Sequence, residues 1–129
     1  MNLSPDSSTK PAAATSSPRT WRRKFGDALR GCGVAVRDQR SFWVHLAFAL
    51  VVPAAGVIAH LQSWQWSALC LCITLVLVAE MLNTALEALA KAVDPDVNPH
   101  LRDALDIGSA AVLLAAAGAA AVGGIVFLS

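Results

Sequence analysis

Three polar side chains, Glu80, Asn83 and Glu87, follow a long uncharged segment that runs from Trp66 to Ala79. In a helix, their spacing of three and then four residues places all three side chains on one face. An ionisable group inside a bilayer costs roughly 2.5 to 3.5 kcal/mol on insertion scales, so such a group is a functional-site hypothesis by default. Glu80, the deeper of the two acids, is placed to act as a general base, and Glu87 lies at the boundary, where it meets cytosolic solutes.

Two further acids, Asp103 and Asp106, come just after the polar connection of residues 94–99. The sequence therefore predicts four acids near one membrane boundary. Magnesium prefers one or two carboxylates together with substrate phosphates, so this boundary suits a nucleotide that docks from the cytosol. Phosphoryl transfer requires mainly positioning and neutralisation of charge. The chain contains no Walker A loop and no protein-kinase loop, which indicates a nucleotide site of another kind.

Composition indicates the elements that must hold these residues. The chain has 129 residues, 56% hydrophobic residues, 15% charged residues and a mean hydropathy of +0.55. This is too apolar for an ordinary soluble domain of its size. We therefore expect an all-α integral membrane protein with one membrane domain over residues 21–129.

The N-terminal part divides into two segments. Residues 1–20 have almost nothing to bury, so we expect a disordered tail, with an organellar transit peptide as the alternative. From Trp21 onward, apolar residues recur every three to four positions between Arg and Lys side chains. This pattern predicts an amphipathic surface helix over residues 21–38, lying on an anionic membrane face.

Three membrane helices are expected over residues 42–61, 64–92 and 101–128. Each is long enough for a bilayer core that needs about 20 helical residues. All ten Lys and Arg residues lie in the N-terminal segment or in residues 91–102. By the positive-inside rule, the N-terminus and the second connection face the cytoplasm.

Two segments carry a resemblance to a known family. The segment Glu80-Met-Leu-Asn-Thr-Ala-Leu-Glu87, followed by Asp106-Ile-Gly-Ser-Ala-Ala-Val-Leu113, resembles the prokaryotic diacylglycerol kinase family, which includes the undecaprenol kinases. The likeness covers roughly residues 25–128. The segment from Arg40 to His45 is similar to the undecaprenol kinase branch, in which His45 stands where the other branch carries Glu.

The resemblance implies a multi-pass lipid kinase of the bacterial inner membrane that transfers the γ-phosphate of MgATP to a lipid hydroxyl. It also implies a homotrimer with active sites between subunits; the partners are a membrane lipid alcohol and a nucleotide, with no nucleic acid. The roles it implies are catalytic base for Glu80, orientation of the base or the lipid for Asn83, metal binding for Glu87, and nucleotide binding for Asp106. We also predict metal binding for His45, with a packed or interfacial histidine as the alternative.

Two positions depart from the family pattern. Leu105 stands where the family has Lys, and Lys91 stands where it has Asp. Because the missing Lys would pair with phosphates, we predict that Lys91 or Arg102 supplies the cation at the nucleotide site. Leu105 also favours an alternative, a non-catalytic relative that binds lipid. A transporter component with Glu80 as a proton site is a third class, and the identity of the lipid alcohol stays open between diacylglycerol and undecaprenol.

Overall fold

The computed structural model describes residues 20–38, 40–96 and 98–129. It contains four helices, α1 (Trp21–Asp38), α2 (Arg40–Ile58), α3 (Ser63–Val93) and α4 (Pro99–Leu128). No strand occurs among the described residues, so the expected all-α class is confirmed. A disordered tail was predicted for residues 1–20, of which residues 1–19 lie outside the described part of the chain.

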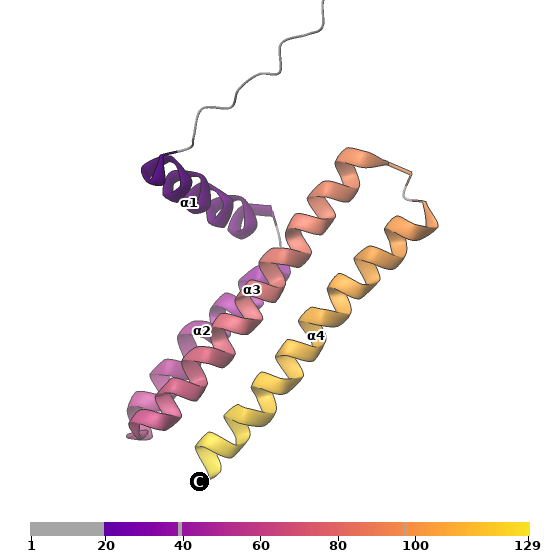
Figure 1. Ribbon diagram of the computed structural model, residues 1–129. Helices are drawn as coiled ribbons and strands as arrows, with labels where there is room; N and C mark the ends of the chain where they lie inside the picture. Colours follow the sequence, from indigo (N-terminus) through magenta and orange to yellow (C-terminus); the bar gives the residue numbers. More distant parts are fainter. Residues whose placement is uncertain (1–19, 39, 97) are drawn as a thin grey trace, which may run out of the picture.

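The two longest helices form an antiparallel pair, with α2 alongside the first half of α3 (Figure 1). α3 has 31 residues and α4 has 30, and both are long and apolar enough to cross a membrane. A third crossing results when α1 and α2 are taken together as one bent pair, with an angle of 104° between them. The chain is therefore an all-α membrane protein in which α1 turns sharply away from the membrane-crossing bundle (Figure 1).

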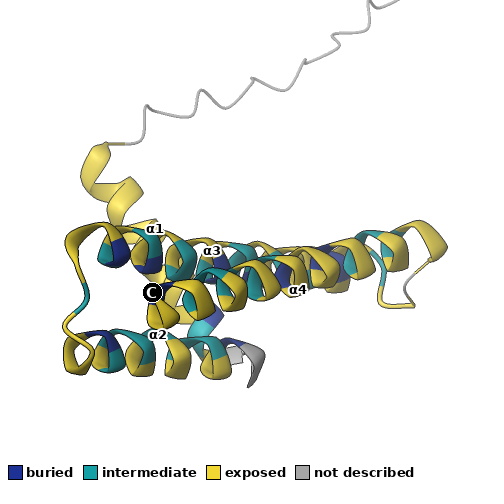
Figure 2. Ribbon diagram, turned by 90° about the horizontal axis from the view of Figure 1, so that it is seen from below, coloured by how far each residue is buried: buried dark blue, intermediate teal, exposed yellow. Residues whose placement is uncertain are grey.

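Burial is confined to a narrow stripe where the helices meet, and most of the surface is exposed (Figure 2). Large apolar side chains such as Leu71, Leu75 and Leu114 are exposed, as expected for faces that contact lipid or other apolar partners. On α3 the stripe combines apolar with polar side chains. Its members are Gln65, Leu69, Val76, Glu80, Thr84 and Ala90.

The turn between α2 and α3 begins earlier than the sequence pattern suggests, because α2 ends at Ile58 where we expected residue 61. His60 adopts the left-handed conformation with φ 52°. The His60 N–H donates to the Val57 carbonyl at 3.2 Å, and the Leu61 N–H donates to the Gly56 carbonyl at 3.3 Å. These two bonds form a Schellman cap, which usually has glycine at the left-handed position. Histidine at that position gave no sequence signal for the end of the helix.

The connection between α3 and α4 is organised by Asp94. Its carboxylate accepts from the Asp96 N–H at 3.0 Å and from the Asn98 N–H at 3.2 Å. Asn98 in turn caps α4, since its Oδ1 accepts from the Leu101 N–H at 3.0 Å. Pro99 then occupies the first helical turn, where its missing N–H has no cost. This chain of bonds sets where α4 begins, close to the polar end of α3.

Candidate functional site

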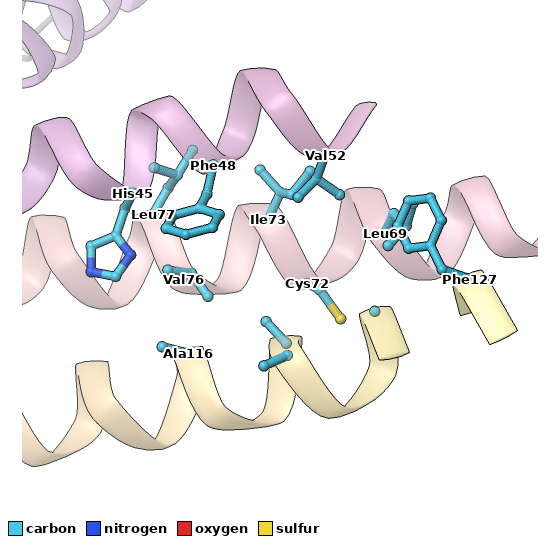
Figure 3. A pocket seen from close by; sticks show the side chains of 13 residues that line it. His45, Phe48, Val52, Leu69, Cys72, Ile73, Val76, Leu77, Ala116 and Phe127 are labelled. Atoms are coloured by element: carbon cyan, nitrogen blue, oxygen red, sulfur yellow. The ribbon is translucent and has the colours of Figure 1, made fainter. Parts of the chain in front are cut away.

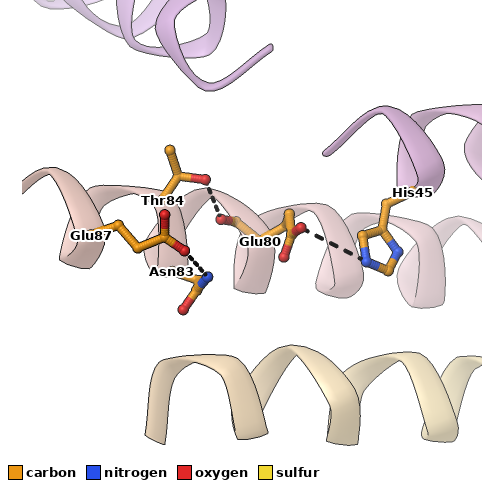
Figure 4. Close-up of polar contacts among 5 residues, drawn as sticks. All are labelled: His45, Glu80, Asn83, Thr84 and Glu87. Carbon is orange, nitrogen blue, oxygen red and sulfur yellow. Dashed lines mark hydrogen bonds and ion pairs between the residues drawn. The ribbon is translucent and has the colours of Figure 1, made fainter. Parts of the chain in front are cut away.

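Glu80 lies on the buried face of α3 with only 2% of its surface exposed. Its Oε1 is 3.9 Å from Nε2 of His45 on α2, which is beyond hydrogen-bond range but within the range of a charge interaction (Figure 4). The Thr84 hydroxyl donates to the Glu80 backbone carbonyl at 2.9 Å and leaves the carboxylate untouched. Burying a carboxylate with so little compensation is costly, so its position requires an explanation other than packing.

Asn83 and Glu87 form a second polar pair one turn further along α3. The Asn83 Nδ2 donates to Glu87 Oε1 at 3.0 Å. The Asn83 side chain points from α3 toward α4 (Figure 4). Its Oδ1 is buried and has no hydrogen-bond partner among the described residues. The structure thus joins Asn83 to Glu87, while Glu80 lies beside His45.

An apolar groove of about 440 Å³ lies between α2, α3 and α4 (Figure 3). It has the size of a small-molecule site. His45 lies at the groove and also faces Glu80, so the groove and the buried carboxylate share one side chain. Such an arrangement can hold a hydrocarbon chain whose polar end reaches a carboxylate. The groove is lined by His45, Phe48, Val52, Leu69, Cys72, Ile73, Val76, Leu77, Ala116, Ala119, Ala120, Gly123 and Phe127.

A second hollow, of about 280 Å³, lies where α3 approaches the connection to α4. Glu87 and Lys91 from α3 line it together with Leu105 from α4. Two other residues predicted for the nucleotide site, Arg102 and Asp106, are exposed and do not line this hollow. Lys91 and Arg102 were the two candidates to replace the family Lys at position 105. Of these, Lys91 is the one that lines the same hollow as Glu87 and Leu105.

The two residues predicted to bind metal lie in different surroundings. His45 is beside Glu80, whereas Glu87 bonds to Asn83 and lines the second hollow. The described residues contain no group of three or more His, Cys, Asp or Glu side chains able to hold a metal ion. Glu87 in an open hollow nevertheless fits magnesium, which usually takes one or two carboxylates plus phosphates and waters. The metal role of both residues stays a prediction, and the position of His45 favours a role at Glu80.

Three residues of the α3–α4 contact were not singled out from the sequence. Thr84 is buried behind Glu80, and Gly108 of α4 lies against Asn83. Gln65 is buried near the start of α3, where its Nε2 donates to the Val126 carbonyl at 2.9 Å. The available signal for Gln65 was its position three residues after Gln62, the spacing of a capping box. Gly108 lies within the segment from Asp106 to Leu113 that carries the family resemblance, but its contact with Asn83 depends on which residue of the neighbouring helix faces it.

Comparison with known proteins gives consistent results. The model of the family described as prokaryotic diacylglycerol kinase matches residues 26–127. The chain is 35% identical over 105 residues to a diacylglycerol kinase of Synechocystis sp., a match that covers 81% of this chain and 60% of that protein's length. It is 29% identical over 106 residues to an undecaprenol kinase of Bacillus subtilis, covering 82% of this chain and 86% of that protein. No solved structure gives a significant match. The extent of the family match shows that this chain belongs to the prokaryotic diacylglycerol kinase family.

Proposed function

We propose that this chain is an active lipid kinase that transfers the γ-phosphate of MgATP to a lipid hydroxyl. The observation that carries the proposal is a nearly fully buried carboxylate, Glu80, beside the histidine that lines an apolar groove. Relatives named diacylglycerol kinase and undecaprenol kinase support this reaction class. We further propose a homotrimer in the inner membrane of a bacterium, with the N-terminus in the cytoplasm.

The lipid chain lies in the apolar groove, and its hydroxyl lies at the His45 end, next to Glu80. A Glu80 carboxylate oxygen accepts the hydroxyl proton as the lipid oxygen bonds to the γ-phosphorus, while the bond between that phosphorus and the β,γ-bridging oxygen breaks and ADP leaves. His45, with Nε2 3.9 Å from Glu80 Oε1, lies close enough to interact electrostatically with the carboxylate and lines the groove that holds the lipid. Because the surroundings are apolar, water is kept from competing with the lipid hydroxyl.

The nucleotide phosphates bind at the second hollow, where Glu87 and Lys91 meet. Glu87 would hold magnesium, which would supply positive charge to neutralise the phosphates. Lys91 supplies the positive charge that the family's Lys provides at the position of Leu105. Asp106 is exposed on α4, where it is free to contact a nucleotide bound to a neighbouring subunit of the proposed trimer, whereas Arg102 does not line the hollow and is not needed for nucleotide binding.

A second candidate function is a non-catalytic relative that binds lipid without phosphorylating it. Leu105 favours this candidate, because it places an apolar side chain in the hollow that the proposal assigns to phosphates. The burial of Glu80 argues against it, since a lipid-binding scaffold gains nothing from a buried carboxylate.

Phosphate transfer from γ-labelled MgATP distinguishes the two candidates. Purified protein in lipid micelles is offered diacylglycerol and undecaprenol separately, alongside Glu80→Gln and the matched control Asp96→Asn in the exposed connection. We expect transfer to one lipid, a loss of about 10²- to 10⁴-fold in Glu80→Gln, and full activity in the control. Folded wild-type protein that phosphorylates neither lipid would support the non-catalytic candidate.

A further inference from the structure

Gly108 on α4 makes an unusually close approach to α3. It is buried, and a Cβ atom built on it would lie 2.6 Å from Asn83 Oδ1 and 3.1 Å from Leu86 Cδ1. Contacts below 3.0 Å force a displacement, so any side chain here would have to move the Asn83 amide. The other glycines of α4 are different, because nothing lies within 4 Å of the corresponding position at Gly118, Gly123 or Gly124.

The orientation of the Asn83 amide follows from its two neighbours. A carboxylate only accepts hydrogen bonds, so the amide nitrogen must face Glu87, with which it bonds at 3.0 Å. The amide oxygen is then directed at Gly108, where it is buried without a hydrogen-bond partner among the described residues. Leaving a buried carbonyl unpaired is unfavourable, and a weak Cα–H contact from glycine compensates only partly. The arrangement therefore sacrifices stability to keep the amide in one place.

We infer that Gly108 is a positioning residue for the Glu87 carboxylate. The missing side chain of Gly108 leaves the space that the Asn83 oxygen occupies, and Asn83 in turn holds Glu87 Oε1 through its amide nitrogen. This inference rests on the proposed function, because the proposed function assigns Glu87 the role of metal ligand. Groups that orient a metal-binding side chain typically change metal affinity about 10- to 100-fold when altered.

The test measures Mn²⁺ binding by electron paramagnetic resonance, in micelles containing a non-hydrolysable ATP analogue. Gly108→Ala is compared with wild type, with Glu87→Gln and with Gly118→Ala, the matched control on the same helix. We expect Gly108→Ala to weaken Mn²⁺ binding by about 10- to 100-fold and Gly118→Ala to leave it unchanged. Because Gly108 acts through Asn83, adding Gly108→Ala to Asn83→Ala should cause no additional loss.

The results separate two kinds of failure. Wild-type protein that binds no Mn²⁺, or Glu87→Gln that binds it as tightly as wild type, would overturn the metal role of Glu87 and the inference with it. Folded Gly108→Ala that binds Mn²⁺ as well as Gly118→Ala would overturn the inference alone. If Gly108→Ala does not fold, Asn83→Ala decides, since unaltered Mn²⁺ binding in that variant also contradicts the positioning of Glu87 by Asn83.

Discussion

Two carboxamides lie on the same face of α3, Gln65 near its start and Asn83 about two-thirds of the way along, and they differ in how many of their polar atoms have hydrogen-bond partners. Both the amide nitrogen and the amide oxygen of Gln65 make hydrogen bonds. Its Nε2 donates to the Val126 carbonyl and to the Ser129 hydroxyl, and its Oε1 accepts from the Gln62 N–H at 2.7 Å. Asn83 makes one hydrogen bond, to Glu87, and its buried oxygen has no partner among the described residues.

The difference indicates two purposes for polar groups in one apolar contact. A satisfied buried amide fixes the relative position of two helices. An unsatisfied buried group is unfavourable for folding and is found where function requires it. We therefore expect the Gln65 contact to contribute mainly to stability, and we propose that the region of Glu80, Asn83 and Glu87 serves the reaction. Changes near Asn83 should alter ligand binding, and changes near Gln65 should alter unfolding.

The largest effect among the following changes is expected at the reaction end, in Lys91→Ala. Removing the positive charge from the hollow that Glu87 lines should raise the ATP concentration for half-maximal rate by about tenfold. Arg102→Ala, the control, removes an exposed charge that does not line the hollow and should change this value by less than about twofold. Initial rates at fixed lipid and varied MgATP measure both. A larger effect in Arg102→Ala would assign the cation to α4.

A smaller effect is expected in the groove that lies between the two carboxamides. Ala120 lines this groove and its neighbour Ala121 does not. Ala120→Leu should raise the KM for the lipid by roughly fivefold, because the added carbons cost about 1 kcal/mol in displaced lipid chain. The KM for ATP should not change. Ala121→Leu serves as the control, and equal lipid KM values in the two variants would show that the lipid chain binds elsewhere.

The smallest effect is expected at the turn that precedes Gln65. His60 has φ 52°, a conformation that costs L residues roughly 1 to 2 kcal/mol but costs glycine little. After allowance for the greater freedom of glycine in the unfolded chain, His60→Gly should stabilise the protein by up to about 1 kcal/mol. His60→Ala keeps the strain and should show no gain. Thermal unfolding in detergent measures both variants, and kinase activity should be unchanged.

The sequence was sufficient for the class of fold and for placing the residues of the central motif on one helix face. Uncharged segments of sufficient length predicted membrane helices, and the spacing of Glu80, Asn83 and Glu87 predicted polar side chains at one part of α3. These features depend on properties within a single helix. The amphipathic pattern after Trp21 likewise predicted a separate helix, and α1 occupies Trp21–Asp38.

The contacts between helices were beyond the reach of sequence reasoning. The short connection puts Gly108 at about the level of Asn83 and Gly118 about 15 Å further along α4, but whether Gly108 faces Asn83 depends on the rotation of α4 about its axis. The grouping of His45 with Glu80, and of Lys91 with Leu105, also depends on how the helices pack. The early end of α2 was missed because histidine rarely adopts the left-handed conformation of a helix cap.

The most direct test of the division between the two contacts is a matched pair, Gln65→Leu and Asn83→Leu, each measured for unfolding and for kinase activity. We expect Gln65→Leu to lose about 1 to 3 kcal/mol of stability, because the Gln62 N–H loses its partner, while its rate at saturating substrates is unchanged. Asn83→Leu should stay within about 1 kcal/mol of wild type, because it removes an unpaired buried oxygen, and should lose activity by at least about tenfold. Parallel losses of stability and activity in both variants would contradict the account.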